Sequence, residues 1–139
     1  MQQLPKLNLK NKVSAQEWQI RIDLAACYRL LHLHGWDDLI HTHVSARIPG
    51  TEHLLINAFG LAFEEITASN LVKIDIDGNV IDKDSPFVIN PAGFTIHSAV
   101  HEARHEDICA LHIHSNDTIA VASVEEGLLP LSQYSMFAL

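Results

Sequence analysis

Basic residues are few in this sequence, and long apolar runs are absent from it. Nine Lys and Arg residues stand against 17 Asp and Glu, which gives a formal net charge of −8 at pH 7. That balance argues against binding to nucleic-acid phosphates or to an anionic membrane. No stretch reaches the roughly 20 apolar residues of a membrane-spanning helix, and the polar start MQQLPKLNLKNK lacks the apolar centre of a secretory signal. We expect a cytoplasmic protein whose partner is a small molecule or another protein.

Cysteine is also scarce, whereas histidine is abundant. Cys27 and Cys109 lie far apart, each inside an apolar run, which predicts two buried reduced thiols with no catalytic role. The ten histidines are the unusual feature of the composition. Histidine is the commonest metal ligand and a proton carrier near neutral pH. Composition alone does not choose between these two uses.

The length and apolar content predict one domain. With 139 residues, 47% of them hydrophobic, the chain can bury a single core. Residues 1–12 are polar and aperiodic, which predicts a flexible arm ahead of a domain at 13–139. The final residues, LLPLSQYSMFAL, leave apolar side chains without a closing element. Since exposed apolar patches favour association, we expect the domain to be incomplete at its C-terminal end.

Three helices are predicted. Ser14 and Glu17 match a capping box, and apolar residues at helical spacing behind them predict a helix over 15–34 that stops at Gly35. Arg21 is expected on the exposed face of this helix. A second helix, over 94–104, follows Pro91, and a third is predicted over 117–124.

Short apolar or alternating runs predict strands between the helices. Residues 44–48 and 54–56 form one expected hairpin, and 72–76 and 80–81 form a second around Asp-Gly-Asn. Residues 108–114 make an apolar run interrupted only by histidine, which predicts a buried central strand. Helices mixed with hairpins in this order favour an α/β fold, with helices packed against a sheet.

His112 and His114 form the strongest chemical motif. On a strand, residues two apart point to the same face, with Cα atoms about 7 Å apart, so both imidazoles can reach one cation. The alternative is a pair of core histidines bonded to backbone or water. Burying two uncompensated imidazoles at the end of an apolar strand would be costly, so metal ligation is favoured.

The other histidines are less distinctive. His41 and His43 repeat the H-x-H pattern in an expected loop, where we predict that His41 is exposed. His97, His101 and His105 recur every four residues along the second helix and share one side of it, a spacing that can hold a metal. We expect His101 and His105 at the surface and leave His97 open, because it lies nearest the helix start.

Several segments together resemble one family. These are NPAGFTIHSAVHEAR, LHIHS and GLLPLS, with RIDLAACYRLLHLHGWDDLIHTHVSARIPG and FGLAFEEITASNLVKIDIDGNV upstream. In order and spacing they resemble the class II aldolase/adducin family, most closely its adducin-like branch, from about residue 20 onward. The resemblance implies a three-layer α/β/α fold around a mostly antiparallel sheet, usually assembled into a tetramer.

The resemblance also implies a metal site. His112 and His114 match two of the three histidines that hold zinc or a similar divalent ion in the sugar-phosphate aldolases, and the third is expected beyond the end of this chain. Two imidazoles leave half of a tetrahedral ion's positions open. Gly93 stands where those aldolases have a glutamate that acts as ligand and acid/base. Pro91 and Ala92 replace the paired serines that hold the substrate's phosphate.

Other departures concern the substrate. His43 lies in a segment that replaces an Asn-containing phosphate loop, and Gly60 follows Phe59 where the aldolases have Thr-Gly. His43, Gly60 and Gly93 are therefore the expected substrate-binding positions. His97, one helical turn after Gly93, is the candidate catalytic residue that could move a proton in place of the missing glutamate.

Three functions remain open at this point. The first is a metal-dependent lyase, of aldolase or decarboxylase type, that acts on a small oxygenated substrate without requiring phosphate. The second is a non-catalytic adducin-like module for assembly or protein binding, with contact to actin and the cytoskeleton expected only by adducin analogy. The third is an inactive fragment of such a protein.

Overall fold

The computed structural model describes residues 8–106 and 108–139. Residues 1–7 of the predicted arm lie outside the described residues, whereas Lys12 closes a turn by donating to the carbonyl of Leu9 at 2.8 Å. None of the described helices is long and apolar enough to cross a bilayer. In chain order the elements are α1 (Ala15–Leu33), β1 (His43–Arg47), β2 (Leu54–Ile56), η1 (Phe63–Glu65), β3 (Val72–Ile74), α2 (Pro91–Ala103), β4 (Cys109–His112), α3 (Asn116–Ala122) and α4 (Gln133–Ala138).

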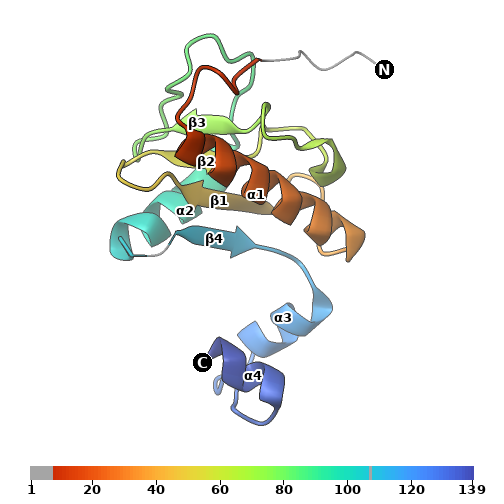
Figure 1. Cartoon of the computed structure of the whole chain (residues 1–139). Helices are drawn as coiled ribbons and strands as arrows, with labels where there is room; N and C mark the ends of the chain where they lie inside the picture. The colour runs from red at the N-terminus through yellow and green to blue at the C-terminus, as the bar shows by residue number, and fades with distance from the viewer. Residues whose placement is uncertain (1–7, 107) are drawn as a thin grey trace.

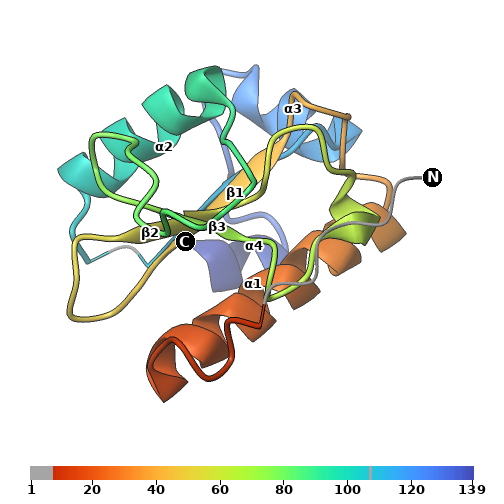
Figure 2. The same ribbon diagram turned by 90° about the horizontal axis from the view of Figure 1, so that it is seen from above.

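Four antiparallel strands form the sheet, in the order β3-β2-β1-β4. Helix α1 covers one face of this sheet and α2 the other (Figures 1 and 2). The predicted three-layer α/β/α architecture is therefore confirmed. Helices α3 and α4 follow β4 and lie below it in Figure 1, outside the three layers.

Helix α1 follows the predicted boundaries but not the predicted exposure. Ser14 caps it by accepting from the backbone N–H of Glu17 at 3.0 Å. The expectation of an exposed Arg21 is wrong, because this side chain is fully buried. Its guanidinium donates to Glu17 at 3.0 Å and to the Leu71 carbonyl at 2.8 Å, and it pairs with Asp82 at 3.3 Å. Helical spacing did not reveal these partners, which come from distant segments.

Strand β4 is not the buried central strand that its apolar sequence predicted. Among the described residues it forms an edge of the sheet and pairs only with β1. Leu111 is half exposed, and Cys109 is a free, exposed thiol, whereas Cys27 is partly buried. The prediction of two buried thiols is therefore wrong for Cys109.

A buried tyrosine fixes the start of β1 against α1. Tyr28 is fully buried, and its hydroxyl accepts from the backbone N–H groups of Val44 and Asn57 at 2.9 and 3.1 Å. The same hydroxyl donates to the Val44 carbonyl. The ring packs edge-on against Phe63, with centroids 4.6 Å apart. Tyr28 thus sets the position of the strand on which His43 lies.

Replacing Tyr28 with Phe tests this anchor. Tyr28→Phe leaves two buried backbone N–H groups without their acceptor, so the free energy of unfolding should fall by about 1–3 kcal/mol. Urea denaturation provides the measurement. Tyr134, which is 85% exposed, supplies the matched control, and Tyr134→Phe should be neutral. Equal stability of the two variants would contradict the anchoring role.

Candidate functional site

The site begins with the alternation of residues along β1. His43, Ser45 and Arg47 face α2, while Val44 and Ala46 face α1, because successive side chains of a strand point to opposite faces. All five residues are buried. The polar side of this strand is therefore enclosed in the protein instead of facing water.

Helix α2 supplies the opposing groups. Asn90 caps it by accepting from the backbone N–H of Ala92 at 3.1 Å. His97 and His101, four residues apart, lie on the same side of the helix and face β1. The prediction that His101 lies at the surface is wrong, since it is fully buried, whereas His105 is exposed as expected.

A continuous chain of hydrogen bonds joins the strand and the helix. Nδ1 of His43 lies 2.6 Å from Nε2 of His97, and Nδ1 of His97 lies 2.5 Å from Oγ of Ser45. The same Oγ lies 2.8 Å from Nε2 of His101. Arg47 closes this end of the cluster by donating to the backbone carbonyl of His101 at 2.6 Å.

The sheet register brings the predicted ligand pair to the other end of this chain. His43 and His112 are directly opposite in the β1–β4 ladder, and Nδ1 of His112 lies 3.3 Å from Nε2 of His43. The rings of His112 and His114 lie together, with centroids 5.1 Å apart and planes at 76°. Nδ1 of His114 is hydrogen-bonded to Asp38 at 2.8 Å.

Gly93 lies against the ring of His43. A Cβ at this position would lie 2.7 Å from Cδ2 of His43, closer than carbon atoms pack. The absence of a side chain at position 93 is what admits the imidazole. The expected loop position of His43 is wrong, since it is the first residue of β1 and only 4% exposed.

Not every predicted substrate position joins this cluster. Gly60 is exposed, with a φ of +85°, and lines a depression that also includes Asp37, Leu39 and Ile40. None of the contacts among the histidines involves it. His41 is exposed as predicted and lies outside the hydrogen-bond chain.

The imidazoles of His43, His97 and His112 are held neutral. Burial, reinforced by neighbouring imidazoles, lowers the pKa of His43 to about 4 and the pKa of His97 to about 3. Burial also lowers the pKa of His112, with a smaller contribution from His114. Each of these rings therefore offers one N–H donor and one lone pair at neutral pH.

The donor set fits part of a metal site. Hydrogen bonds engage Nδ1 of both His112 and His114, and no hydrogen bond reaches Nε2 of either ring from residues 8–106 or 108–139. Metal-binding histidines commonly use one nitrogen for the ion and the other for a hydrogen bond that orients the ring. Within the described part of the chain, no group of three or more His, Cys, Asp or Glu residues is arranged to hold an ion. The described residues therefore bring together two candidate ligands, His112 and His114.

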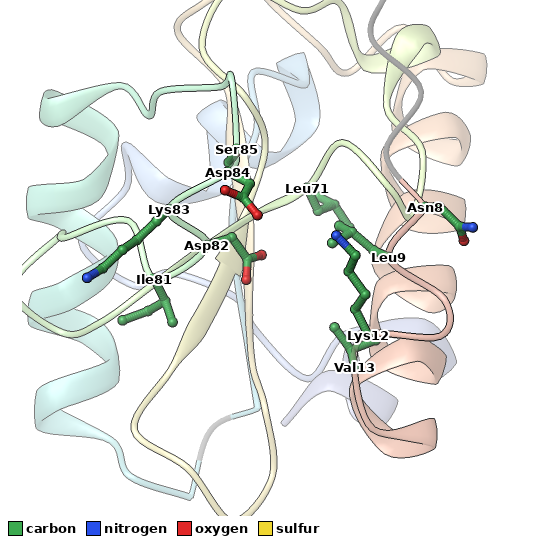
Figure 3. A pocket seen from close by; sticks show the side chains of 10 residues that line it. All are labelled: Asn8, Leu9, Lys12, Val13, Leu71, Ile81, Asp82, Lys83, Asp84 and Ser85. Atoms are coloured by element: carbon green, nitrogen blue, oxygen red, sulfur yellow. The ribbon is translucent and has the colours of Figure 1, made fainter.

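One cavity of the protein lies away from the histidines. It measures about 340 Å³ and lies between residues 8–13 and the 81–85 segment. Figure 3 shows Lys12 on one side and Asp82 and Asp84 on the other, and no histidine lines the cavity. Its charges are of both signs, so it selects no ligand chemistry.

Sequence comparison identifies the family. The profile described as Class II Aldolase and Adducin N-terminal domain matches residues 22–139. The chain belongs to the class II aldolase and adducin family. A class 2 aldolase-like protein of Caulobacter vibrioides is 62% identical over 137 residues, which are 98% of this chain and 53% of that protein. The chain spans about half the length of the curated bacterial relatives it matches.

Solved structures show the same fold. An aldolase II superfamily protein from Pseudomonas syringae is 56% identical with a TM-score of 0.85, over 94% of this chain and 52% of that one. An L-fuculose 1-phosphate aldolase from Glaciozyma antarctica is 32% identical with a TM-score of 0.77, over 96% of this chain and 53% of that one. The adducin side of the family is represented by mouse alpha-adducin, 46% identical over 81% of this chain and 16% of that protein.

Sequence reasoning missed three of the residues that the structure brings together here. Ser45, His101 and Asp38 were not expected among them. The polar alternation of His43, Ser45 and Arg47 was a usable signal. A polar strand face normally suggests solvent, but a helix with histidines four residues apart offers it a buried partner.

A double-mutant cycle tests the contact between Gly93 and His43. Gly93→Ala alone should lower the free energy of unfolding by about 1–3 kcal/mol, because the added methyl overpacks the ring. In a His43→Ala background the same change should be neutral or stabilising, since Ala is about 1 kcal/mol better than Gly inside a helix. Chemical denaturation of the four proteins gives the coupling energy. Equal costs in both backgrounds would contradict the contact.

The neutral state of His97 predicts acid sensitivity of the fold. In the folded chain the pKa is lowered to about 3, whereas an unfolded histidine takes up its proton near pH 6.5. Between these values the unfolded state binds more protons, so stability is complete above about pH 6.5 and is lost as pH falls. Urea unfolding at about pH 7.5 and about pH 5.5 measures the loss.

Two glutamine variants control this experiment. His97→Gln should reduce the dependence of stability on pH, because it removes one titrating ring, while His43, whose pKa is also lowered, continues to contribute. His105→Gln removes an exposed histidine near the end of the same helix and should retain the parental slope. A His97→Gln protein with an unchanged slope would show that other groups cause the acid sensitivity.

Proposed function

We propose that this chain contributes part of the active site of a metal-dependent lyase, of aldolase or decarboxylase type. Its substrate is a small oxygenated molecule, and its ion is zinc or a similar divalent cation. The observation that carries the proposal is the paired arrangement of His112 and His114, with Nδ1 of each ring engaged by a protein group. Family membership supports the reaction class.

His112 and His114 would hold the ion through Nε2, and a third histidine is proposed beyond the end of the chain. When bound, a divalent ion acts as a Lewis acid that polarises a carbonyl oxygen. Asp38 keeps the Nδ1 proton of His114 in place, which leaves the lone pair on Nε2. His43 engages Nδ1 of His112 in the corresponding way.

The start of α2 supports a substrate without phosphate. Helix N-termini bind phosphate through their first backbone N–H groups and neighbouring hydroxyls. Here Pro91 has no N–H group, and the N–H of Ala92 is already bonded to the side chain of Asn90 at 3.1 Å. Gly93 offers no side chain. This segment is poorly suited to grip a phosphate group, so the substrate class we propose is a neutral or carboxylated polyol-type molecule.

Self-association is also part of the proposal. Apolar side chains at the C-terminal end of the chain are exposed, among them Leu131, Tyr134 and Phe137, each at least 78%. Surfaces of this kind favour contact with further protein, and a tetramer of the longer protein is proposed by family analogy. A cytoplasmic location completes the proposal. Sedimentation of the isolated chain as a monomer at every concentration would contradict self-association.

A second candidate is a non-catalytic adducin-like module, with or without contact to the cytoskeleton. Two points favour it: the 46% identity to mouse alpha-adducin, and the glycine at position 93, where the family resemblance implies a glutamate in the aldolases. In that case the histidine cluster would be structural. An inactive fragment is the remaining alternative for the isolated chain.

Titration of the isolated chain with zinc distinguishes the metal-dependent lyase from the non-catalytic module. We expect weak binding by the isolated chain, because two imidazoles leave the coordination sphere open. His112→Ala and His114→Ala should each weaken binding by about 10-fold or more, and His105→Ala, at an exposed histidine, should not. Isothermal titration calorimetry gives these affinities. Tight one-to-one binding by a monomeric chain would contradict an incomplete ligand set.

The full-length Caulobacter relative tests the reaction itself. It should contain stoichiometric metal and should catalyse aldol cleavage or decarboxylation of small hydroxylated acids or sugars. A chelator should abolish turnover, and added metal should restore it. If the purified relative holds no metal and turns over none of these substrates, the lyase proposal fails and the binding module remains.

A further inference from the structure

A chain of hydrogen bonds leads from His112 into the protein interior and couples the tautomers of its imidazole rings. Four contacts link His112, His43, His97, Ser45 and His101 in that order, at 3.3, 2.6, 2.5 and 2.8 Å. Each of these four contacts joins a ring nitrogen to a second ring nitrogen or to the Ser45 hydroxyl. Each neutral imidazole can donate from only one of its two nitrogens.

Proton counting leaves two arrangements for the three rings of His112, His43 and His97. If Nδ1 of His112 carries its proton and donates to Nε2 of His43, then His43 must donate from Nδ1. His97 must then also donate from Nδ1, to the hydroxyl of Ser45. In the reverse arrangement every ring carries its proton on Nε2. Intermediate arrangements place two N–H groups, or two lone pairs, face to face at the buried His43–His97 contact or at the part-buried His43–His112 contact, which is costly.

Burial of the rings enforces the restriction to two tautomer arrangements. His43, Ser45, His97 and His101 are each at most 4% exposed, so water cannot replace a mismatched partner. The lowered pKa values of His43 and His97 agree with neutral rings at these two positions. A buried polar network of this kind is stable only when every member is satisfied.

We infer that His43, His97 and Ser45 are positioning residues, which fix the tautomer of His112 through this chain. The inference rests on the proposed function, because it concerns the nitrogen that His112 offers to a cation. An ion on Nε2 of His112 requires the proton on Nδ1, and this selects the arrangement in which His43 and His97 both carry Nδ1 protons. His97 therefore acts through His43 and does not itself reach the site.

The His43 ring occupies the space beside Gly93 that a side chain at position 93 would fill. A carboxylate at 93 and this buried chain exclude each other. Imidazoles and the Ser45 hydroxyl therefore orient His112. Gly93 is required because it leaves room for the His43 ring.

Nitrogen-15 NMR of the isolated chain, with labelled histidine, tests the coupling without any turnover. Ring signals are assigned through single His→Asn variants, and spectra are recorded with and without zinc. Without metal, His43 and His97 should share one tautomer, and with zinc on His112 both should carry the proton on Nδ1. Opposite tautomers in the two rings, or Nε2 protons on both with zinc bound, would overturn the inference.

Substitution of Ser45 supplies the second measurement. Ser45→Ala removes the acceptor for His97 Nδ1, so it should favour Nε2 protons on His97 and His43 and weaken zinc binding by about 10- to 100-fold. Ser98→Ala, on the neighbouring position of α2, is the matched control and should change neither property. Unchanged tautomers in Ser45→Ala would overturn the coupling. Absence of any zinc effect on the His112 signals would instead remove the proposed function, while the shared tautomer of His43 and His97 in the metal-free chain still tests the coupling.

Discussion

The packing of the His43 ring against Gly93 is the contact on which the rest of the site depends. It places an imidazole in a gap between β1 and α2 that only a glycine leaves open. From that position the ring meets His97 on one side and His112 on the other. If the ring were displaced, the polar face of β1 would lose its buried partners, and His112 would lose the group that orients it.

The contact between His43 and Gly93 also distinguishes this chain from the sugar-phosphate aldolases that it resembles. The class II aldolase and adducin family includes an L-fuculose 1-phosphate aldolase and the adducins, and this chain is similar to both. The resemblance places a glutamate at position 93 in the sugar-phosphate aldolases. Here that position is a glycine, and imidazoles occupy the space beside it. His112, the last residue of β4, and His114, two residues beyond it, lie next to these imidazoles.

Much of the fold could be predicted from local sequence. The capped helix behind Ser14, the first hairpin and the helix after Pro91 follow from local spacing and from residues with fixed backbone preferences. The predicted three-layer architecture followed from the family resemblance and from the order of elements. These features depend on neighbours a few residues apart, which a single sequence displays directly.

The remaining features depend on partners far apart in the chain. Arg21 was predicted exposed because its helix pattern does not display Asp82 or the carbonyl of Leu71. His101 was placed at the surface for the same reason, since its partner Ser45 is 56 residues away. Strand β4 was predicted to be buried because apolar composition does not distinguish a central strand from one at the edge of the described sheet. His112 and His114 could be paired from the sequence because their relation is local.

We propose that His112 and His114 share one cation through their Nε2 atoms. Anomalous diffraction at the zinc edge, from crystals of a full-length relative grown with zinc, measures this directly. We expect one peak about 2.0–2.1 Å from Nε2 of both histidines that match positions 112 and 114. A peak bound through Nδ1 of either ring, or zinc held only at other residues, would contradict it.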